Sequence, residues 1–258
     1  MAASRVLVTR PAGQEAPLRA ALEARGLQVF HQPLIELQPR AEPDPAQRAI
    51  LQQLDLYQHV IFISTNAVHY GMAWLEDYWP QWPVGLHWYA VGSGTARALS
   101  AFGIQALVPE RDMNSEGLLR LPPLRDLHGQ RVLIVKGEGG RLVLRDETRR
   151  RGARVDQLAC YRRAPVRLPA GEMAARLAEW RADLLLLSSG EGLDNLLALL
   201  SPEETSKLGQ RATLLVPSRR VAQAAEAAGL GRVRVAENAS DEAMLQAVER
   251  WLRDSGDD

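Results

Sequence analysis

Residues 131–163 read RVLIVKGEGGRLVLRDETRRRGARVDQLACYRR, and this stretch decides the fold of the chain. Val132–Val135 is a short apolar, mostly β-branched run, which predicts a buried strand. The Gly-rich segment KGEGG, residues 136–140, follows directly. The pattern of residues 141–151 is helical, and that of residues 155–161 indicates a second strand. The stretch therefore predicts a unit of strand, loop, helix and strand.

The Gly-rich loop of this unit has two interpretations. Its backbone N–H groups and the N-terminus of the following helix face the same space, which makes a good seat for an anion. Alternatively, Gly139 and Gly140 form a tight strand-to-helix turn that requires glycine and binds nothing. The sequence leaves both interpretations open.

The N-terminal stretch repeats this pattern. Residues 5–29 read RVLVTRPAGQEAPLRAALEARGLQV, and an offset of 126 matches Arg5, Gly13, Arg19, Arg25 and Gly26 with Arg131, Gly139, Arg145, Arg151 and Gly152. Downstream, residues 60–65 (VIFIST) resemble residues 184–189 (LLLLSS) with an offset of 124. Residues 89–94 and 214–219 are similar with an offset of 125. We therefore predict an internal duplication of one α/β unit.

Composition limits the possible functions. The chain has 258 residues, enough for two domains, and equal numbers (31 each) of Lys+Arg and Asp+Glu. A net charge of zero disfavours nucleic-acid binding and a membrane-surface role. The single cysteine, Cys160, excludes an intrachain disulfide and suits a reducing cytoplasm. With no signal peptide and no apolar run of about 20 residues, a cytoplasmic location is expected.

Predicted strands alternate with predicted helices along the chain, and several strands are continuous apolar runs. This pattern indicates two similar doubly wound α/β domains with parallel sheets. The elements predicted late in each repeat include a short strand at Gln105–Val108, a helix at Leu193–Leu200 followed by a strand at Thr213–Val216, and a frayed tail at Asp254–Asp258.

Hydroxyl groups, glycines and a few cations stand where the predicted parallel strands end, and ligands of such sheets bind beyond the carboxyl ends of the strands. Each Ser or Thr there can be a helix N-cap only. Together these ends would offer many N–H and hydroxyl donors to a ligand with several carboxylates or phosphates. The candidate binding residues are Arg10, Ser64, Thr65, Gly92, Ser93, Thr95, Lys136, Gly137, Glu138, Gly139, Gly140, Ser188, Ser189, Gly190, Pro217 and Ser218.

Common catalytic signatures are missing from the sequence. It contains no GxSxG motif, no GxGxxG with a distal acid and no P-loop. The five histidines lack metal-ligand spacing, so no metal site is predicted. Tyr161 ends the strand before a Pro-rich joint. It can pack in the core, or it can offer a phenol as a hydrogen-bond donor or weak general acid.

Several ordered motifs carry a family resemblance. They are VLVTRP at residues 6–11, FISTNAV at 62–68, VGSGTA at 91–96, NSEGLL at 114–119, KGEGGR at 136–141 and CYRR at 160–163. Taken together, over essentially the whole chain, they resemble uroporphyrinogen-III synthases. Thr65-Asn66 and residues 217–219 depart from the polar residues of that family, so the resemblance does not fix the roles of individual residues at these two strand ends.

The resemblance implies two α/β domains joined by two extended linkers, with the chain starting in one domain, building the second and returning to the first. It places the first domain at residues 1–37 and 166–258 and the second at 42–160. Residues 38–41 and 161–165 are then the linkers.

The resemblance also implies a lyase of haem and sirohaem biosynthesis. This enzyme would cyclise hydroxymethylbilane, a linear tetrapyrrole with eight carboxylates, into uroporphyrinogen III with inversion of ring D and loss of water. No cofactor or metal is implied, and Tyr161 is the candidate proton donor to the leaving hydroxyl. We expect a monomer without nucleic-acid or membrane partners.

Two other functions remain open at this point. The chain could be a non-enzymatic two-domain module that binds a small polyanionic metabolite without turnover. It could also be a nucleotide-dependent transferase that uses the loop at residues 137–140, although the usual nucleotide signatures are missing.

Overall fold

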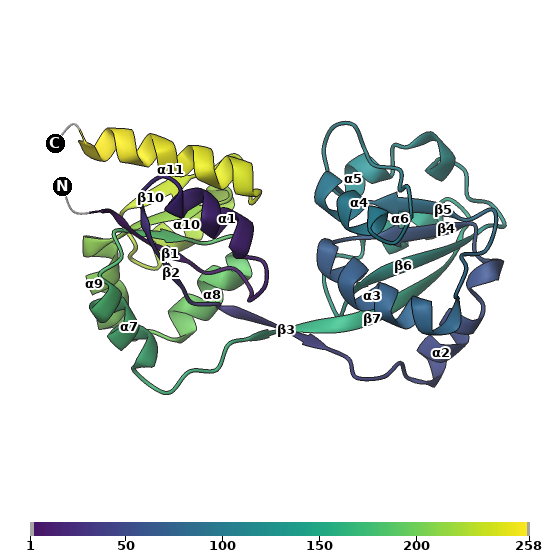
Figure 1. The fold of residues 1–258 in the computed structure, drawn as a ribbon, viewed down its shortest axis with the longest axis horizontal. Helices are drawn as coiled ribbons and strands as arrows, with labels where there is room; N and C mark the ends of the chain where they lie inside the picture. The colour runs from purple at the N-terminus through teal and green to yellow at the C-terminus, as the bar shows by residue number, and fades with distance from the viewer. Residues whose placement is uncertain (1–2, 257–258) are drawn as a thin grey trace. The chain divides into compact units, whose positions relative to one another are not determined.

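The computed structural model describes residues 3–256 of the chain. The chain forms two compact units, each built around one five-stranded sheet (Figure 1). Unit 1 consists of Met1–Leu37 and Ala164–Asp258, and unit 2 consists of Gln38–Arg163. Strand β1 pairs in parallel with β2 and β8, β9 with β8 and β10, β4 with β5 and β6, and β6 with β7, which confirms the predicted α/β class.

Unit 1 has the strand order β10-β9-β8-β1-β2. Its strands are β1 (Arg5–Val8), β2 (Gln28–His31), β8 (Leu184–Leu186), β9 (Thr213–Val216) and β10 (Val233–Val235). Its helices are α1 (Ala16–Glu23), α7 (Glu172–Trp180), α8 (Gly190–Ala198), α9 (Pro202–Arg211), α10 (Arg219–Ala227) and α11 (Asp241–Gly256).

Unit 2 has the strand order β3-β7-β6-β4-β5. Its strands are β3 (Ile35–Pro39), β4 (His59–Phe62), β5 (His87–Ala90), β6 (Arg131–Gly137) and β7 (Arg154–Pro165). Its helices are α2 (Pro45–Gln52), α3 (Thr65–Tyr78), α4 (Ser93–Ser100), α5 (Ser115–Leu118) and α6 (Val143–Arg150), with 3-10 turns at Leu54–Leu56 and Pro122–Leu124.

Alternation along the strands places a core on each face of a sheet, because successive side chains of a strand point to opposite faces. In β1, Val6 and Val8 pack with α1 and α11, whereas Leu7 packs with α7, α8 and α10 on the other face. All three residues are fully buried. Helices accordingly cover both faces of each sheet (Figure 1).

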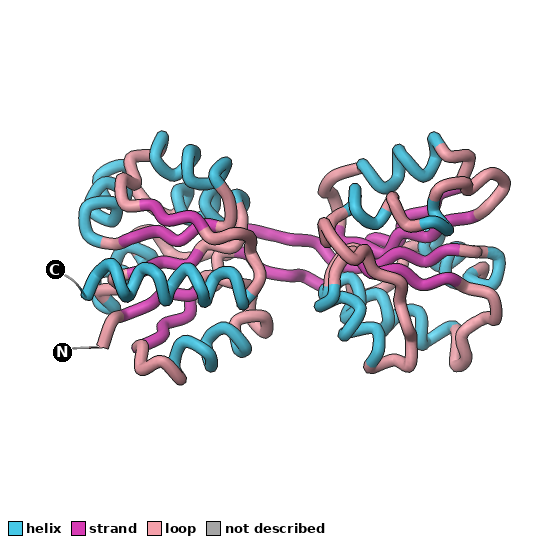
Figure 2. Tube along the Cα trace, turned by 90° about the horizontal axis from the view of Figure 1, so that it is seen from above, coloured by secondary structure: helices cyan, strands magenta, loops and turns pink. Residues whose placement is uncertain are grey.

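The chain passes from unit 1 to unit 2 through β3 and returns through β7 (Figure 2). These two strands are neighbours in the sheet of unit 2. The N–H of Arg40 donates to the carbonyl of Cys160 at 3.1 Å, and the Arg162 Nε donates to Gln38 Oε1 at 2.6 Å. Both connecting segments are therefore extended and hydrogen-bonded strands.

The two sheets arrange the strands of the sequence repeat in the same order. Strands β2-β1-β8-β9 in unit 1 match β7-β6-β4-β5 in unit 2, so each sheet combines the first half of one repeat with the second half of the other. The register shows where the sequence alignment was wrong. Leu184 lies opposite Val6 and His59 lies opposite Val132, which gives an offset of 125 for β4 and β8 in place of 124.

The strand pairing also changes the offset that relates β5 to β9 in the sequence repeat. Thr213 lies opposite Leu184 and His87 lies opposite His59, so their offset is 126 and the aligned offset of 125 was wrong. Continuous aliphatic runs such as LLLL look alike after a shift by one residue, and only pairing with a neighbouring strand fixes their register. The corrected register makes Ser64 equivalent to Ser189 and Gly92 equivalent to Ser218.

Three sequence-based predictions about elements need correction. The strand predicted at Gln105–Val108 is reduced to one bridge between Tyr89 and Leu107, because Pro109 follows and has no N–H to extend the ladder. Helix α9 was not predicted, although Ser201 and Glu204 form a capping box at its start. The tail predicted to fray is helical to Gly256, and residues 257–258 lie outside the described part.

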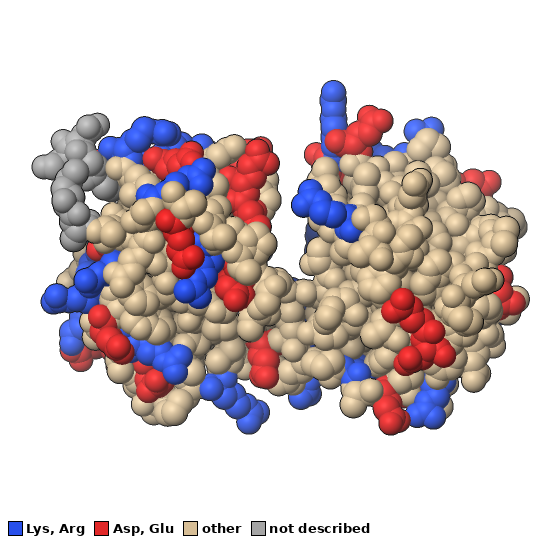
Figure 3. Space-filling view, viewed as in Figure 1, with Lys and Arg blue, Asp and Glu red and all other residues tan. Residues whose placement is uncertain are grey.

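Charged side chains of both signs are interspersed over the face of each unit shown in Figure 3. This distribution fits the zero net charge of the sequence. Among the described residues, no helix is both long enough and apolar enough to cross a membrane.

Candidate active site

The carboxyl ends of β4 and β5 lead directly into helices. Ser64 is the N-cap of α3, and its Oγ accepts a hydrogen bond from the N–H of Ala67 at 3.1 Å. Gly92 is the N-cap of α4, so the predicted loop residues Ser93 and Thr95 belong to the first turn of that helix. Thr95 is buried, whereas Thr65 and Ser93 are exposed. These ends present helix N-termini at the carboxyl edge of the sheet, as predicted.

The Gly-rich loop after β6 owes its glycines to backbone conformation. Gly139 and Gly140 have φ values of +71° and +80°, in the left-handed region that favours glycine. Helix α6 begins at Val143, two residues later than the predicted start at Arg141. Because the helix N-terminus does not adjoin the two glycines, the tight-turn interpretation accounts for them without a ligand.

Tyr161 is placed by an irregularity in the sheet. Lys136 pairs with Ala159 and Gly137 pairs with Tyr161, so Cys160 is an extra residue and forms a bulge in β7. Bulges re-aim the side chains that follow them. The Tyr161 hydroxyl lies 3.1 Å from Ser64 Oγ, and the N–H of Glu138 donates to the Tyr161 carbonyl at 2.7 Å.

The position of the Tyr161 ring requires a glycine at position 137, because any side chain there would collide with the ring. A Cβ at Gly137 would lie 2.7 Å from Tyr161 Cζ, closer than real Cβ atoms approach. The ring of Tyr70 from α3 lies against Tyr161 with 5.3 Å between centroids. Tyr161 is 4% exposed. Its ring is thus tightly held while its hydroxyl meets a helix N-cap.

Neighbouring groups of Tyr161 are kept neutral. Burial raises the pKa of Tyr70, and the nearby Tyr161 and Cys160 add to this effect. Burial also raises the pKa of the Cys160 thiol to about 12. The thiol donates to the Lys136 carbonyl at 3.3 Å. Cys160 is therefore an unreactive packing residue.

Lys136 lies on the other face of the sheet from Tyr161. It alternates along β6 with Gly137, whose missing side chain leaves room for Tyr161. Lys136 is 5% exposed and lines a cavity of about 420 Å³ beside α6. Gly140 also lines this cavity, whereas Glu138 is exposed.

The strand ends of unit 1 are more fully paired. The Arg10 guanidinium forms an ion pair with Asp241 and donates to the carbonyl of Ala239 at 2.8 Å. Ser189 is the N-cap of α8, where its Oγ accepts from the N–H of Gly192 at 3.0 Å. The remaining predicted residues Ser188, Gly190, Pro217 and Ser218 stand beside these caps, half-buried. Ser218 is the N-cap of α10 without a side-chain hydrogen bond.

Some residues of the site were missed in the sequence. Tyr70 was not considered, although it lies in the second turn of α3 and its ring contacts Tyr161. Asn114 and Ser115 were named only as part of the NSEGLL motif, and Arg141, Arg145 and Arg163 were not among the candidate binding residues. All five of these polar residues line the cavity that contains Lys136. Three arginines in the same stretch of sequence as a strand-end lysine could have indicated this cavity, because together they predict a positively charged site.

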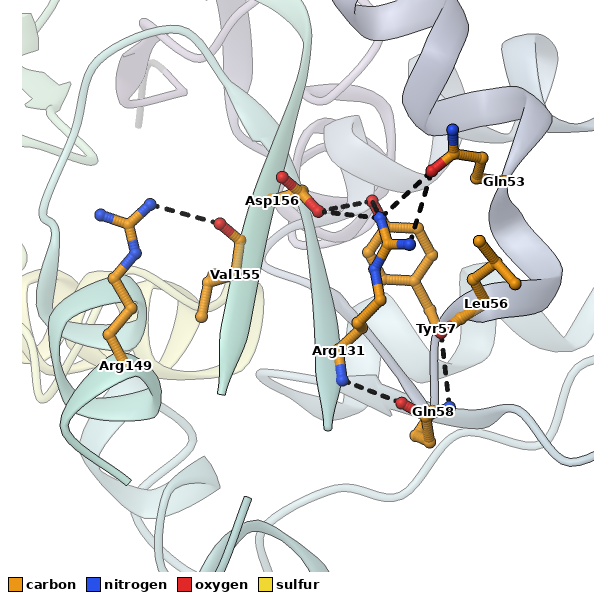
Figure 4. Close-up of polar contacts among 8 residues, drawn as sticks. All are labelled: Gln53, Leu56, Tyr57, Gln58, Arg131, Arg149, Val155 and Asp156. Atoms are coloured by element: carbon orange, nitrogen blue, oxygen red, sulfur yellow. Dashed lines mark hydrogen bonds and ion pairs between the residues drawn. The ribbon is translucent and has the colours of Figure 1, made fainter. Parts of the chain in front are cut away.

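A second polar cluster lies at the opposite, amino end of β6 (Figure 4). The Arg131 guanidinium stacks over Tyr57 at 4.5 Å and pairs with Asp156 at 3.4 Å. The Tyr57 hydroxyl donates to Asp156 at 2.8 Å, and the Arg131 N–H donates to Gln58 at 2.8 Å. The cluster ties Tyr57, Arg131 and Asp156 together at this end of the sheet, although the buried Arg131 Nε has no hydrogen-bond partner. Within residues 3–256, no group of three or more His, Cys, Asp or Glu side chains is placed to bind a metal.

These features define a class: α/β proteins of two parallel-sheet units with polar groups gathered at the strand ends. The sequence model of the family described as uroporphyrinogen-III synthase HemD matches residues 16–246. The chain therefore belongs to the uroporphyrinogen-III synthase family, which confirms the resemblance seen in the sequence.

Individual relatives agree with this assignment. The uroporphyrinogen-III synthase of Escherichia coli (strain K12) is 34% identical over 247 residues, covering 95% of this chain and 99% of the relative. Two solved structures share the fold. A mutant uroporphyrinogen III synthase of Thermus thermophilus has a TM-score of 0.61 at 22% identity, covering 98% of this chain and 100% of its own. The enzyme of Helicobacter pylori 26695 has a TM-score of 0.60 at 17% identity, covering 97% and 100%.

Proposed function

We propose that this chain converts hydroxymethylbilane into uroporphyrinogen III, with Tyr161 as the proton donor. Membership of the family makes the chain an enzyme of tetrapyrrole biosynthesis, a lyase that closes a ring. The observation that carries the role of Tyr161 is its hydroxyl, which lies 3.1 Å from the N-cap oxygen of α3.

The first step is loss of the substrate hydroxyl. Tyr161 donates its phenolic proton to that oxygen, the C–O bond breaks with its electron pair going to oxygen, and water leaves. The remaining electrophilic azafulvene is attacked by the substituted carbon of ring D. The resulting spiro intermediate reopens and closes again with ring D inverted, and the proton lost from the closing pyrrole carbon balances the one that Tyr161 gave.

Ser64 supports this step electrostatically. Its Oγ accepts from the N–H of Ala67, which leaves its own proton free to point at the Tyr161 oxygen. The N-terminus of the 14-residue helix α3 adds a partial positive charge at the same place. Both effects favour the phenolate that forms when the proton is transferred. The substrate cyclises spontaneously to the uninverted isomer, so the protein's remaining task is to hold the chain folded for inversion.

The decisive test is an isomer assay. Freshly prepared hydroxymethylbilane is incubated with the protein, the products are oxidised, and uroporphyrin isomers I and III are separated. We expect isomer III well above the control without protein. Isomer I alone, formed at the spontaneous rate, would contradict the proposal and favour the binding-module alternative.

The proposal extends to the state and location of the protein. We expect a monomer in the cytoplasm, with the two domains joined by linkers at residues 38–41 and 161–165. The single cysteine is buried, as suits a reducing compartment. Sedimentation equilibrium at micromolar concentration tests the monomer, and a mass of twice 28.5 kDa would contradict it.

A further inference from the structure

The two units carry a cation at the same position of the repeat. The offset of 126 that relates β1 to β6 makes Arg10 equivalent to Lys136. The caps of two later helices are related by the same offset. Ser240 Oγ accepts from the N–H of Ala243 at the start of α11, and Asn114 Oδ1 accepts from the N–H of Gly117 at the start of α5. Asp241, the first residue of α11, is therefore equivalent to Ser115.

In unit 1 the cation has an internal counter-ion. The Arg10 side chain is 14% exposed and pairs with the carboxylate of Asp241. It also donates to the Ala239 carbonyl at 2.8 Å. A cation so far from water requires such partners, because burying an unpaired charge is costly.

In unit 2 the counter-ion is missing. Serine replaces the equivalent aspartate at position 115, while the cation is kept as Lys136. Lys136 is 5% exposed, and its ammonium has no hydrogen-bond or ion-pair partner among residues 3–256. Burial lowers the pKa of Lys136, and the positive charge of Arg145 lowers it further. This position thus has a charge without the carboxylate that its twin possesses.

The charged residues that line the cavity next to Lys136 are all cations. Arg141, Arg145 and Arg163 share it with Lys136, and no Asp or Glu is among the lining residues. Arg141 is paired with Glu116 at 3.1 Å and Arg145 with Asp146 at 2.8 Å, but neither acid lines the cavity. A volume of about 420 Å³ lies within the range of small-ligand sites.

We propose that this cavity binds a carboxylate side chain of the tetrapyrrole, which takes the place that the Asp241 carboxylate holds in unit 1. The inference rests on the proposed function for the identity of the ligand. An ammonium and a carboxylate form a strong charge-assisted hydrogen bond when water is excluded. Because Lys136 and Tyr161 occupy opposite faces of the sheet edge, Lys136 anchors the substrate at a distance from the reacting carbon.

Restoring the missing acid tests the inference. In Ser115→Asp the chain supplies its own carboxylate to Lys136, which should exclude that of the substrate. We expect the KM for hydroxymethylbilane to rise about 10- to 100-fold, the value of one hydrogen bond to a charged group. The matched variant Ser115→Asn has the same size without the charge, and its KM should rise far less. Equal KM values for the two variants would overturn the inference, provided that circular dichroism shows both folded.

A second measurement uses the wild-type protein and does not depend on turnover. The sequence contains two lysines, Lys136 and Lys207, so ¹³C-labelled lysine gives two side-chain signals. Lys207 is exposed and paired with Glu203 at 2.7 Å, which makes it an internal control. Addition of uroporphyrinogen III under reducing conditions should shift the Lys136 signal and leave that of Lys207 in place.

The two proposals fail in different ways. A wild-type protein that forms isomer III but shows no shift of Lys136 on saturation with uroporphyrinogen III would overturn the carboxylate site alone. A protein that forms no isomer III would overturn the proposed function, whatever Lys136 does.

Discussion

Unit 1 and unit 2 share one strand order but differ in what their strand ends leave unsatisfied. In unit 1, Arg10 is neutralised by Asp241, and β2 pairs with β1 without a register shift. In unit 2, Lys136 lacks a counter-ion among the described residues, and β7 carries the bulge that aims Tyr161 at Ser64. The difference teaches that two copies of one repeated fold can differ in polar pairing, and under the proposed function the less fully paired copy carries the reactive groups.

The largest expected effect tests whether the chemistry is confined to unit 2. Tyr161→Phe removes the proposed proton donor and should slow isomer III formation about 10- to 1000-fold, the range for a lost general acid. The rate is measured with fresh hydroxymethylbilane against the spontaneous background.

The neighbouring Tyr70 provides a matched control for this variant. Tyr70→Phe removes a hydroxyl from the ring that contacts Tyr161 and should leave the rate within about threefold of wild type, because no step uses that hydroxyl. A Tyr161→Phe protein as fast as Tyr70→Phe would remove Tyr161 from the mechanism.

A second prediction concerns the bulge and the space that it requires. Gly137→Ala places a Cβ 2.7 Å from Tyr161 Cζ, so the ring must move. We expect a loss of about 1–3 kcal/mol in the free energy of unfolding, as for other overpacked sites, together with slower isomer III formation. Urea denaturation and the isomer assay measure the two effects.

Gly94→Ala is the control for added volume. Its Cβ would meet Thr65 at 3.8 Å, an ordinary contact in the first turn of α4. Stability should stay the same or rise slightly, since alanine favours a helix more than glycine does. If both alanine variants behaved alike, the close approach of Gly137 to Tyr161 would not matter.

A smaller effect is expected from the ion pair of unit 1. Asp241→Asn leaves Arg10 without its counter-ion and should lower the free energy of unfolding by about 1 kcal/mol at low salt, because Arg10 is mostly buried and Asp241 partly exposed. Denaturation at low and high ionic strength measures the loss.

The exposed pair of Glu203 and Lys207 serves as the reference, since Glu203→Gln should change the stability very little. If Asp241→Asn changed the free energy of unfolding as little as Glu203→Gln, Arg10 would not need a counter-ion. The absence of a carboxylate next to Lys136 would then not distinguish unit 2 from unit 1.

The smallest predicted effect is a pH dependence specific to unit 2. His59 is buried between Tyr89 and Gln130 and stacks on His87, whereas its equivalent in unit 1 is Leu184. Burial lowers the pKa of His59 in the folded state, and His87 lowers it further against the hydrogen bond to Gln130, which raises it. The unfolded chain therefore binds the proton more readily. His59 should favour folding above its unfolded pKa of about 6.5 and destabilise the protein as pH falls below that value.

Replacement of this histidine isolates its contribution. We expect His59→Gln to lose less stability than wild type between pH 7.5 and 5.5, by up to about 1 kcal/mol, in urea titrations at the two pH values. An equal pH dependence in both proteins would show that other groups dominate the acid sensitivity.

Much of the architecture could be predicted from the sequence, because apolar runs and glycines set strands and turns locally. The alternation of strands and helices and the repeat at Arg5 and Arg131 predicted the α/β class. The register of β4 and β8 could not be predicted, because a run of four identical leucines looks the same after a shift by one residue. Helix α9 has no counterpart in unit 2, so the repeat gave no hint of it, although its capping box was readable.

The candidate site was predictable only in part. Serines and glycines before helices pointed to the strand ends, and Ser64 and Ser189 indeed cap helices there. The bulge at Cys160 was not predictable, because it depends on pairing with β6. The ion pair of Arg10 with Asp241 could not be predicted either, because it joins residues more than two hundred positions apart that only the folded sheet brings together.

The exchange of half-repeats between the sheets also sets the order in which the nascent chain can be completed. Residues 38–163 are continuous, so unit 2 can close once that segment has left the ribosome. Strand β1 must wait for β8, and the hydroxyl of Thr9 finds its acceptor, the Leu186 carbonyl, 177 residues later. Until then the aliphatic edge of β1 has no partner on that side. Strand β1 is therefore synthesised before unit 2 but buried after it, and translation speed beyond residue 163 affects how long β1 stays exposed.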